Sequence, residues 1–547
     1  MTKRLILIFL LAIGLSLPWL ASAQTDEVGL PKGFERNTEI QSPEAFWGFG
    51  VGEYHPRHDQ IVAYFRYLET ASDRVSIEVT GYSHDRRPLM VVTFAKPGTD
   101  VDAIKAGRHD NARSGEGPVV AWMGYSVHGN EASAASAAVQ TAWYLAASED
   151  AQVEQWLENM VIVMEPVLNP DGHDRFAHWV NMHRGEQPSK DPNDREHNEI
   201  WPNGRTNYYW FDLNRDWMPL VHPESRARIA EYYAWQPHIV TDFHEMGRNS
   251  TYFFQPGVPE RNNPLTPPEV FELTAEIAKH HAQALDAASE PYYTKESFDD
   301  YYVGKGSTYP DITGGVGILF EQGSARGHVQ ETDYGDRTFA QAVANQVRTS
   351  LSSLSAAEAN AQALLDYQQR FFAGAREGAS QNREAGWVFT DGGDPAKAAV
   401  LIDRLLRHQI EIYPSEEPVQ IAGVEYPASS SWVIPNNQDQ YRLIQSLFEP
   451  VTELPMETFY DVSTWPLGLS YDVPHTSVRR LPARGPELMT APTPEFIAPN
   501  PNAVAWVIPW NQYFAPRALA QLNAEGYRVQ VATQPMTTQS GEVSLVR

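Results

Sequence analysis

The sequence predicts two α/β domains: a larger one built on a mixed sheet with helices on both faces, and a smaller one after it. Three observations lead to this prediction. Predicted strands and helices alternate along most of the 547 residues, a chain long enough for more than one hydrophobic core. Several strands are apolar throughout, as strands buried on both faces are. A small, polar and charged segment at 374–386 separates two stretches of this pattern.

Residues 1–23 are predicted to be a secretory signal peptide. Lys3 and Arg4 form a basic start, residues 5–20 are apolar, and Ala21-Ser22-Ala23 is a small-residue cleavage site. A membrane anchor is the alternative, but the A-x-A ending and the polar residues after it favour cleavage. Because no later run of 18 apolar residues occurs, we expect a secreted or periplasmic protein with no membrane segment after cleavage.

The larger domain is expected over residues 24–373, after an irregular start at 24–45. Runs rich in β-branched and apolar residues predict strands at 74–83, 88–97, 119–126, 160–166, 238–244, 251–257 and 316–322. Apolar residues at helical spacing predict helices at 57–71, 132–147, 223–235, 267–288 and within 338–373.

A linker is expected at 374–386 and the smaller domain at 387–547. Strands are predicted at 387–393, 410–415, 430–437, 503–510 and 528–534, and helices at 394–409, 438–450 and 515–527. This alternation is typical of a Rossmann-like or flavodoxin-like domain, although it contains neither a G-x-G-x-x-G turn nor a P-loop. One interpretation is that the domain is incomplete, because the chain stops at Arg547 soon after a strand.

Composition excludes several kinds of function. The formal charge of −27 argues against a nucleic-acid partner, because phosphate contacts need a basic surface. The chain has no cysteine, which removes disulfides, thiolate metal sites and a cysteine nucleophile. Any zinc must therefore be held by His, Asp or Glu.

His128 and Glu131 form an H-x-x-E pair directly after the apolar run at 119–126. Ligands commonly lie just past the carboxyl ends of strands in α/β sheets, and a spacing of three brings both side chains to one side of a helical turn. The small Ala and Ser residues that follow would let a helix pack closely beneath them. The pattern alone is weak: a second pair, His328 and Glu331, lacks this setting, and an ordinary polar loop is the alternative.

Hydrolytic zinc sites use three protein ligands and leave one position for water. His244 ends another apolar strand, in IVTDFHEMG, and is the candidate third ligand. Taken alone, it would more simply be a buried histidine satisfied by hydrogen bonds.

Five motifs in order, over residues 119–324, resemble those of the zinc carboxypeptidases, the carboxypeptidase A-like metallopeptidases. They are HGNE at 128–131, NPDG at 169–172, DLNRDW at 212–217, DFHE at 242–245 and ILFEQGS at 318–324. The resemblance implies one Zn²⁺ in the larger domain, bound by His128, Glu131 and His244. It also implies that Glu321 is the general base, the carboxylate that accepts a proton from the zinc-activated water.

The same resemblance suggests the substrate contacts. Asn214 and Arg215 resemble the pair that captures the substrate's C-terminal carboxylate, and Asp212 resembles the acid that orients the first zinc histidine. An arginine about a dozen residues after NPDG shares the oxyanion with zinc in this family; we expect Arg184, with Arg175 as second choice. A mobile tyrosine should cover the substrate, and Tyr301 and Tyr302 are preferred over Tyr309.

The predicted function is that of a secreted zinc metallocarboxypeptidase acting on the C-termini of peptides or proteins. The long polar and aromatic insert at 185–211 leaves the size of the substrate open. One alternative is a zinc amidohydrolase acting on cell-wall peptides or N-acyl amino acids. Another is a zinc-binding pseudoenzyme whose C-terminal domain binds a ligand.

Overall fold

The central sheet of the protein has eight strands in the spatial order β1-β2-β4-β3-β5-β8-β6-β7. The computed structural model describes residues 28–452, 465–494, 500–538 and 541–543. The strands are β1 (Val75–Tyr82), β2 (Pro88–Phe94), β3 (Val119–Tyr125), β4 (Met160–Glu165), β5 (Ile239–Met246), β6 (Tyr252–Phe254), β7 (Tyr292–Tyr293) and β8 (Val316–Gly323). Strands β4, β3, β5 and β8 run parallel, whereas β1–β2, β2–β4 and β6–β8 pair antiparallel. The predicted mixed sheet is confirmed.

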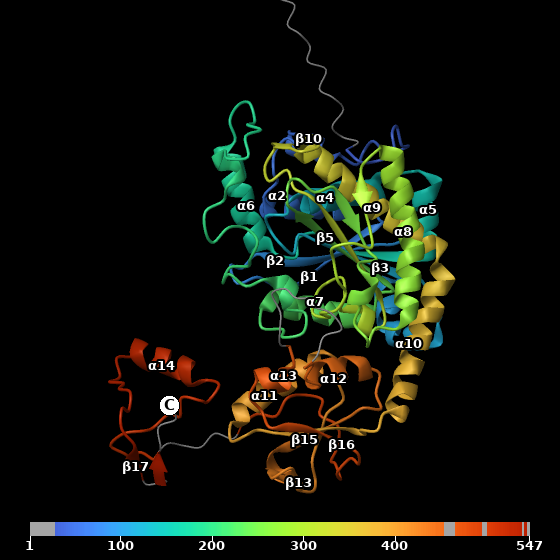
Figure 1. Cartoon of the computed structure of the whole chain (residues 1–547). Coiled ribbons are helices and arrows are strands. Elements are labelled where there is room, and N and C mark those ends of the chain that lie inside the picture. Colours follow the sequence, from blue (N-terminus) through green and yellow to red (C-terminus); the bar gives the residue numbers. More distant parts are fainter. Residues whose placement is uncertain (1–27, 453–464, 495–499, 539–540, 544–547) are drawn as a thin grey trace, which may run out of the picture.

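Both faces of this sheet are covered, as its apolar strands predicted (Figure 1). Along β3, Ala121 and Met123 enter one hydrophobic cluster, whereas Val120 and Trp122 enter another on the opposite face. The first cluster includes side chains from α2, α4, α5, α8 and α9, and the second includes side chains from α7. The helices of this part are α1 (Pro43–Trp47), α2 (His58–Ala71), α3 (Val101–Ser114), α4 (Ser133–Ala147), α5 (Ala151–Asn159), α6 (Pro170–His183), α7 (Pro223–Trp235), α8 (Pro268–Ala288), α9 (Phe339–Ala359) and α10 (Ala361–Gln381).

Helices α3, α5 and α6 were not expected from the sequence. Helix α6 begins inside the NPDG motif, where the Asn169 side chain accepts a hydrogen bond from the Gly172 amide at 3.0 Å and Pro170 occupies the first helical position. The motif is therefore the capped start of a helix as well as a turn.

The expected linker at 374–386 is helical as far as Gln381, because α10 continues through it. The segment after it packs against the larger part: His408 lies 2.6 Å from the Tyr309 hydroxyl and 2.8 Å from the Met218 carbonyl oxygen. Side chains of α7, α11 (Pro395–Arg407) and α12 (Tyr441–Phe448) share one hydrophobic cluster. The two parts thus have a common apolar interface.

The second sheet has the order β12-β15-β11-β16, and each of its pairings is antiparallel. Its strands are β11 (Gly386–Thr390), β12 (Tyr413–Pro414), β15 (Ser431–Pro435) and β16 (His475–Val478). The Rossmann-like or flavodoxin-like prediction is therefore wrong for these residues, since those folds need parallel strands. Alternation along the chain predicted the elements but not the direction in which they pair. Short hairpins are β9–β10 (Val329–Thr332 and Gly335–Thr338), β13–β14 (Val419–Ile421 and Val424–Tyr426) and β17–β18 (Met536–Thr538 and Gly541–Val543), and the remaining helices are α13 (Leu467–Ser470) and α14 (Ala515–Ala524).

The segment 500–538 differs from its prediction. Residues 515–524 form the expected helix, α14, but the strands expected at 503–510 and 528–534 are irregular, and apolar residues such as Trp506 and Val531 are exposed. A strand is stabilised by hydrogen bonds to a neighbouring strand, and neither segment pairs with one among the described residues. The predicted signal peptide at 1–23 lies outside the described residues. In the part of the chain that is described, no helix is both long and apolar enough to cross a bilayer.

Candidate metal centre

Four of the predicted site residues lie at or just after the carboxyl ends of three neighbouring parallel strands. His128 and Glu131 occupy the turn after β3, His244 is in the last part of β5, and Glu321 stands beside His244 in the β5–β8 register. All 15 residues of helix α4, which follows the turn, are buried. The small side chains of α4 therefore allow it to pack fully inside the domain directly behind the ligand turn, as the sequence indicated.

The candidate ligand atoms converge closely. His128 Nδ1 lies 3.0 Å from Glu131 Oε1, and His244 Nδ1 lies 3.1 Å from His128 Nδ1 and 3.0 Å from Glu131 Oε2. All three side chains are buried. Two imidazoles and a carboxylate meeting in this way match the donor set of a hydrolytic zinc site.

The outer nitrogen of each histidine is held by a carboxylate. Asp212 Oδ1 lies 3.0 Å from His128 Nε2, and Asp242 Oδ2 lies 2.9 Å from His244 Nε2. Partners of this kind fix the tautomer and orientation of a metal-binding imidazole. Asp212 was predicted for this position. Asp242 was missed, although its place two residues before His244 puts both side chains on one face of β5.

Electrostatics in the cluster favour a bound cation. Burial alone would lower the pKa of His128 and His244, but the carboxylates of Glu131, Asp212 and Asp242 outweigh it and raise both pKa values. Burial would raise the pKa of Glu131, and the two histidines instead hold it well below its usual range. Three ionised carboxylates therefore surround two imidazoles, so the donor set fits a divalent metal whose binding would displace protons from the histidines.

Glu321 has the environment of a group that exchanges protons near neutral pH. Burial raises its pKa to about 7, with the nearby Glu131 adding to the rise and His244 opposing it. Its Oε2 atom is enclosed and has no hydrogen-bond partner among the described residues. A general base works best when its pKa lies near the operating pH.

Arg205, which was not predicted from the sequence, lies beside the candidate zinc ligands. Its guanidinium donates to Asp212 Oδ2 at 2.9 Å and to Glu131 Oε1 at 3.3 Å, and its side chain is 41% exposed. Arg184, the predicted residue, instead lies over the Tyr54 ring at 4.5 Å and donates to the Tyr54 hydroxyl at 3.0 Å. Spacing from NPDG predicted Arg184, but the structure places Arg205 at the ligand cluster, because the 185–211 insert folds back toward the ligand turn.

Three glycines allow the loop that carries Arg205 to approach the metal ligands. A Cβ atom on Gly129 would lie 2.0 Å from the His173 amide nitrogen, and one on Gly172 would lie 2.4 Å from the Gly204 carbonyl oxygen. HGNE, NPDG and the NGR segment at 203–205 therefore meet backbone to backbone. Glu199 holds the same junction by accepting from the Asn130 amide at 2.8 Å and from the Gly204 amide at 2.7 Å.

Asn214 and Arg215 differ in their surroundings. The buried Asn214 side chain donates to Asp242 Oδ2 at 3.0 Å, lies 3.1 Å from His244 Nε2 and accepts from the Gly306 amide at 2.8 Å. These contacts make it a support for His244 and not a free donor for substrate, contrary to the prediction. Arg215 is partly exposed and also donates to the Asn214 carbonyl at 3.0 Å.

Tyr301 and Tyr302 do not lie at a surface that could cover a substrate. Both are buried in the cluster shared with the second part, with ring centroids 6.1 and 5.4 Å from that of Trp465. Covering a substrate would require either ring to leave this core. Their predicted role is therefore wrong, and Tyr309 is buried as well.

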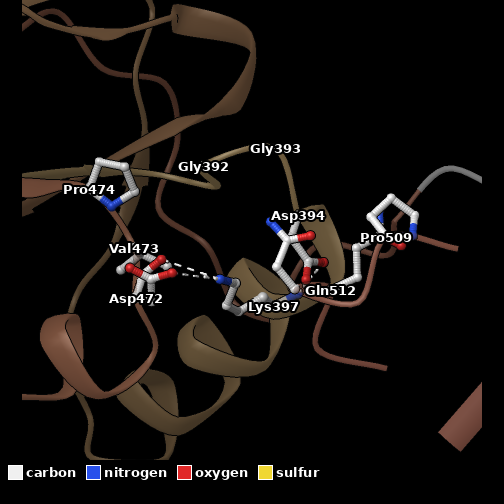
Figure 2. A pocket seen from close by; sticks show the side chains of 10 residues that line it. Gly392, Gly393, Asp394, Lys397, Asp472, Val473, Pro474, Pro509 and Gln512 are labelled. Carbon is white, nitrogen blue, oxygen red and sulfur yellow. Dashed lines mark hydrogen bonds and ion pairs between the residues drawn. The ribbon is translucent and has the colours of Figure 1, made fainter. Parts of the chain in front are cut away.

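A separate pocket of about 470 Å³ lies in the second part of the chain (Figure 2). Its wall includes Gly392, Asp394, Lys397, Asp472 and Gln512, and Lys397 Nζ donates to the Asp472 carbonyl at 3.2 Å. None of the metal-ligand candidates lines it.

The family comparison bears on the ligand cluster directly. The family model described as zinc carboxypeptidase matches residues 61–311. This segment is a zinc carboxypeptidase domain. The match includes His128, Glu131, Asp212 and His244 and ends before Glu321. The predicted resemblance is confirmed, and the chain carries a zinc metallocarboxypeptidase domain. This family depends on zinc.

Several solved structures are similar to this zinc carboxypeptidase domain at low identity. A metallo-carboxypeptidase from Burkholderia cenocepacia is 15% identical with a TM-score of 0.40, covering 55% of this chain and 69% of its own. The carboxypeptidase A from Helicoverpa armigera is 16% identical with a TM-score of 0.39, covering 60% and 76%. A metallo-carboxypeptidase from Pseudomonas aeruginosa in complex with (2-guanidinoethylmercapto)succinic acid is 14% identical with a TM-score of 0.38, covering 56% and 68%. A comparison with curated proteins gave no match.

Proposed function

We propose that this protein is an exported carboxypeptidase that hydrolyses the last peptide bond of peptides or proteins at a single zinc site. The supporting observation is the convergence of His128, Glu131 and His244 at 3.0–3.1 Å, with a carboxylate behind each histidine. A zinc ion held there supplies a Lewis acid and lowers the pKa of a coordinated water to about 7. The chain's other residues then bind the substrate and move protons.

Glu321 accepts the proton of the attacking water and returns it to the leaving amine. Its position beside His244 on the adjacent strand and its pKa of about 7 suit both steps. When the amine leaves protonated, the peptide bond is broken and the carboxylate of Glu321 is regenerated. The residue therefore starts and ends each cycle ionised.

Arg205 stabilises the oxyanion that forms as water adds to the carbonyl. Its guanidinium already lies within 3.3 Å of a metal-ligand oxygen, and its side chain is open to solvent on one side. A fixed cation where negative charge develops lowers the barrier without reorganising during the reaction. The two carboxylates that hold it, Glu131 and Asp212, keep it beside the cluster of candidate zinc ligands.

Arg215 captures the C-terminal carboxylate of the substrate. A guanidinium can make two parallel hydrogen bonds to a carboxylate, which selects substrates with a free C-terminus. Asn214 acts through His244 and Asp242, to which it is bonded, and is a positioning residue.

The export part of the proposal depends on residues 1–23, with their basic start, apolar stretch and A-x-A ending. The expected partners are therefore extracellular or periplasmic peptides with free carboxyl ends. The net charge of −27 continues to argue against nucleic acid.

Mass spectrometry of paired peptides tests the proposal. Each peptide is supplied with a free and with an amidated C-terminus, and incubated with the enzyme, with the chelated enzyme and with zinc-restored enzyme. Ladders shortened from the free carboxyl end, lost on chelation and recovered with zinc, support the proposal. Internal cuts, equal cleavage of the amidated peptides, or cleavage confined to N-acyl amino acids and cell-wall peptides would overturn the carboxypeptidase assignment.

A further inference from the structure

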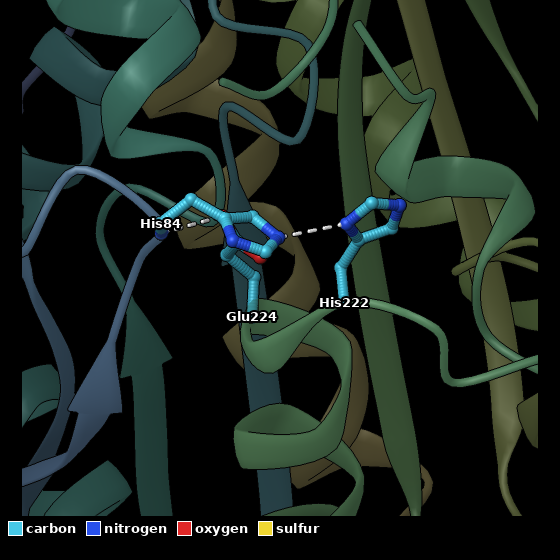
Figure 3. A group of neighbouring side chains, drawn as sticks. All are labelled: His84, His222 and Glu224. Atoms are coloured by element: carbon cyan, nitrogen blue, oxygen red, sulfur yellow. Dashed lines mark hydrogen bonds between the residues drawn. The ribbon is translucent and has the colours of Figure 1, made fainter. Parts of the chain in front are cut away.

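A second group of potential metal ligands lies outside the site described above. His84, in the turn between β1 and β2, faces His222 and Glu224 at the start of α7 (Figure 3). One potential ligand atom from each residue lies within 4.8 Å of the other two. We propose that His84, His222 and Glu224 form a second zinc site, with a structural role.

The spacing of the two imidazoles fits a shared cation. His84 Nε2 lies 3.0 Å from His222 Nδ1, and the ring planes are inclined by 80°. Two nitrogens bound to tetrahedral zinc at 2.0–2.1 Å are roughly 3.3 Å apart. The pair therefore needs only a small opening to admit the ion, like His128 and His244, whose Nδ1 atoms are 3.1 Å apart.

The cluster contains polar atoms that the protein leaves unsatisfied. Among the described residues, buried Glu224 Oε2 has no hydrogen-bond partner; buried His222 Nε2 also has none, but it lies on the side of the ring away from His84. His222 and Glu224 are 6% and 4% exposed, so water satisfies them poorly. A buried polar group without a partner is costly, and a coordinated cation would remove that cost for the carboxylate.

The buried surroundings of the cluster shift the pKa values of all three side chains. Burial lowers the pKa of His84 and of His222, which favours the uncharged form of both imidazoles. Burial raises the pKa of Glu224 to about 7, with the nearby Asp171 and Asp216 adding to the rise. A cation would ionise Glu224, and the absence of cysteine makes an imidazole and carboxylate set the natural one for zinc in this chain.

The surroundings indicate what the ion would stabilise. The Tyr209 ring meets His84 edge-on at 4.7 Å, and the Phe211 ring lies 4.5 Å from His222. Both aromatic residues belong to the insert and lead directly into Asp212, the partner of His128. The turn that carries His84 is tied to NPDG because Ser83 donates to Asp171 at 2.7 Å. The second ion would thus connect the β1–β2 turn to the start of α7, next to Tyr209 and Phe211 of the insert. His84 is only partly buried, which leaves a side on which water can complete the coordination.

Counting bound zinc tests this proposal apart from activity. The whole protein is stripped with a chelator, titrated with zinc, freed of excess metal and analysed by elemental mass spectrometry, with circular dichroism to check folding. We expect two zinc ions per wild-type chain, and one in each of His84→Ala, Glu224→Gln and His128→Ala. The matched control is His109→Ala, an exposed histidine on α3 with a side chain 64% accessible, which should keep both ions.

The double variant His84→Ala/His128→Ala should bind none. The ion that remains in His128→Ala can be replaced by Co²⁺, and we expect its visible absorption to disappear when His84→Ala is added. If the wild type binds one ion and His84→Ala does not change that number, the proposal is wrong. It is also wrong if the wild type binds two ions and both His84→Ala and Glu224→Gln keep two. A failed carboxypeptidase assay leaves either count unchanged, so the two proposals fail independently.

Discussion

Replacing Glu321 with glutamine tests the proposed mechanism at its centre. The amide has the shape of the carboxylate but cannot accept the proton of the attacking water. General acid–base catalysis contributes about 10²–10⁴-fold, so kcat should fall by that factor, which is roughly 3–5 kcal/mol in barrier height. Zinc should remain bound, because Glu321 is outside the set of converging ligand atoms formed by His128, Glu131 and His244. Stability should change little, since burial already disfavours the charged form of Glu321.

The assay is the release of the C-terminal amino acid from a peptide, measured at saturating zinc, together with zinc content and the melting temperature. Glu331→Gln is the matched control, because Glu331 belongs to the other H-x-x-E pair and is exposed on β9. It should keep full activity. If Glu321→Gln retains wild-type kcat, Glu321 is not the base. If zinc is lost in step with activity, Glu321 acts as a ligand and the proposed division of roles is refuted.

Four further predictions follow from the same geometry. Arg205→Ala should lower kcat by about 10²–10³-fold with zinc saturating, as loss of one oxyanion donor does, and an unchanged kcat would return that role to another residue. Asp212→Ala should weaken zinc binding about 10–100-fold in a chelator competition, because His128 loses its orienting carboxylate; equal affinity would show that the hydrogen bond at 3.0 Å is dispensable. Activity should fall as the pH drops, because Glu321 must be ionised to act as the base and burial raises its pKa to about 7. The positive charge of bound zinc would lower this pKa, so the acidic fall in kcat/KM should have its midpoint at or below pH 7. Activity that rises toward acid pH would contradict the role of Glu321 as general base. Gly129→Ala should lower the free energy of unfolding by about 1–3 kcal/mol in denaturant titration, since the added Cβ would lie 2.0 and 2.1 Å from backbone atoms. Gly247→Ala is the control and should not change it, because its Cβ would have no heavy atom within 4 Å. Equal stability of the two variants would mean that the backbone contact between HGNE and NPDG adjusts freely.

The proposed second zinc site affects how the zinc content of these variants is interpreted. If His84, His222 and Glu224 hold an ion, a zinc content of one per chain does not by itself show that the hydrolytic site is loaded. Metal counts on Asp212→Ala are therefore best made in the presence of His84→Ala.

The sequence predicted the elements whose character depends on local patterns. Apolar runs marked β3, β5 and β8, and a strand end followed by His, Glu and small residues marked the ligand turn, which the structure places with His244. Helices α2, α7 and α8 lie at or within one residue of their predicted bounds, because helical periodicity is a property of one segment. The ligand turn follows an apolar strand, whereas Asp212 and Glu321 were predicted from DLNRDW and ILFEQGS, the motifs that resemble those of the zinc carboxypeptidases.

Other features depended on contacts between distant segments, and only the tertiary structure decided them. The direction of the second sheet is one such feature, because strand pairing is set between segments and not within them. The position of Arg205, and not Arg184, beside the ligand cluster is another: it depends on how the insert folds back across three glycines that meet backbone to backbone. Asn214 lost its predicted role because the chain brings Asp242, His244 and Gly306 around it, and these satisfy its amide. A motif specifies which groups are present, whereas packing decides which of them stay free to act, because each buried polar side chain must first satisfy its own hydrogen bonds.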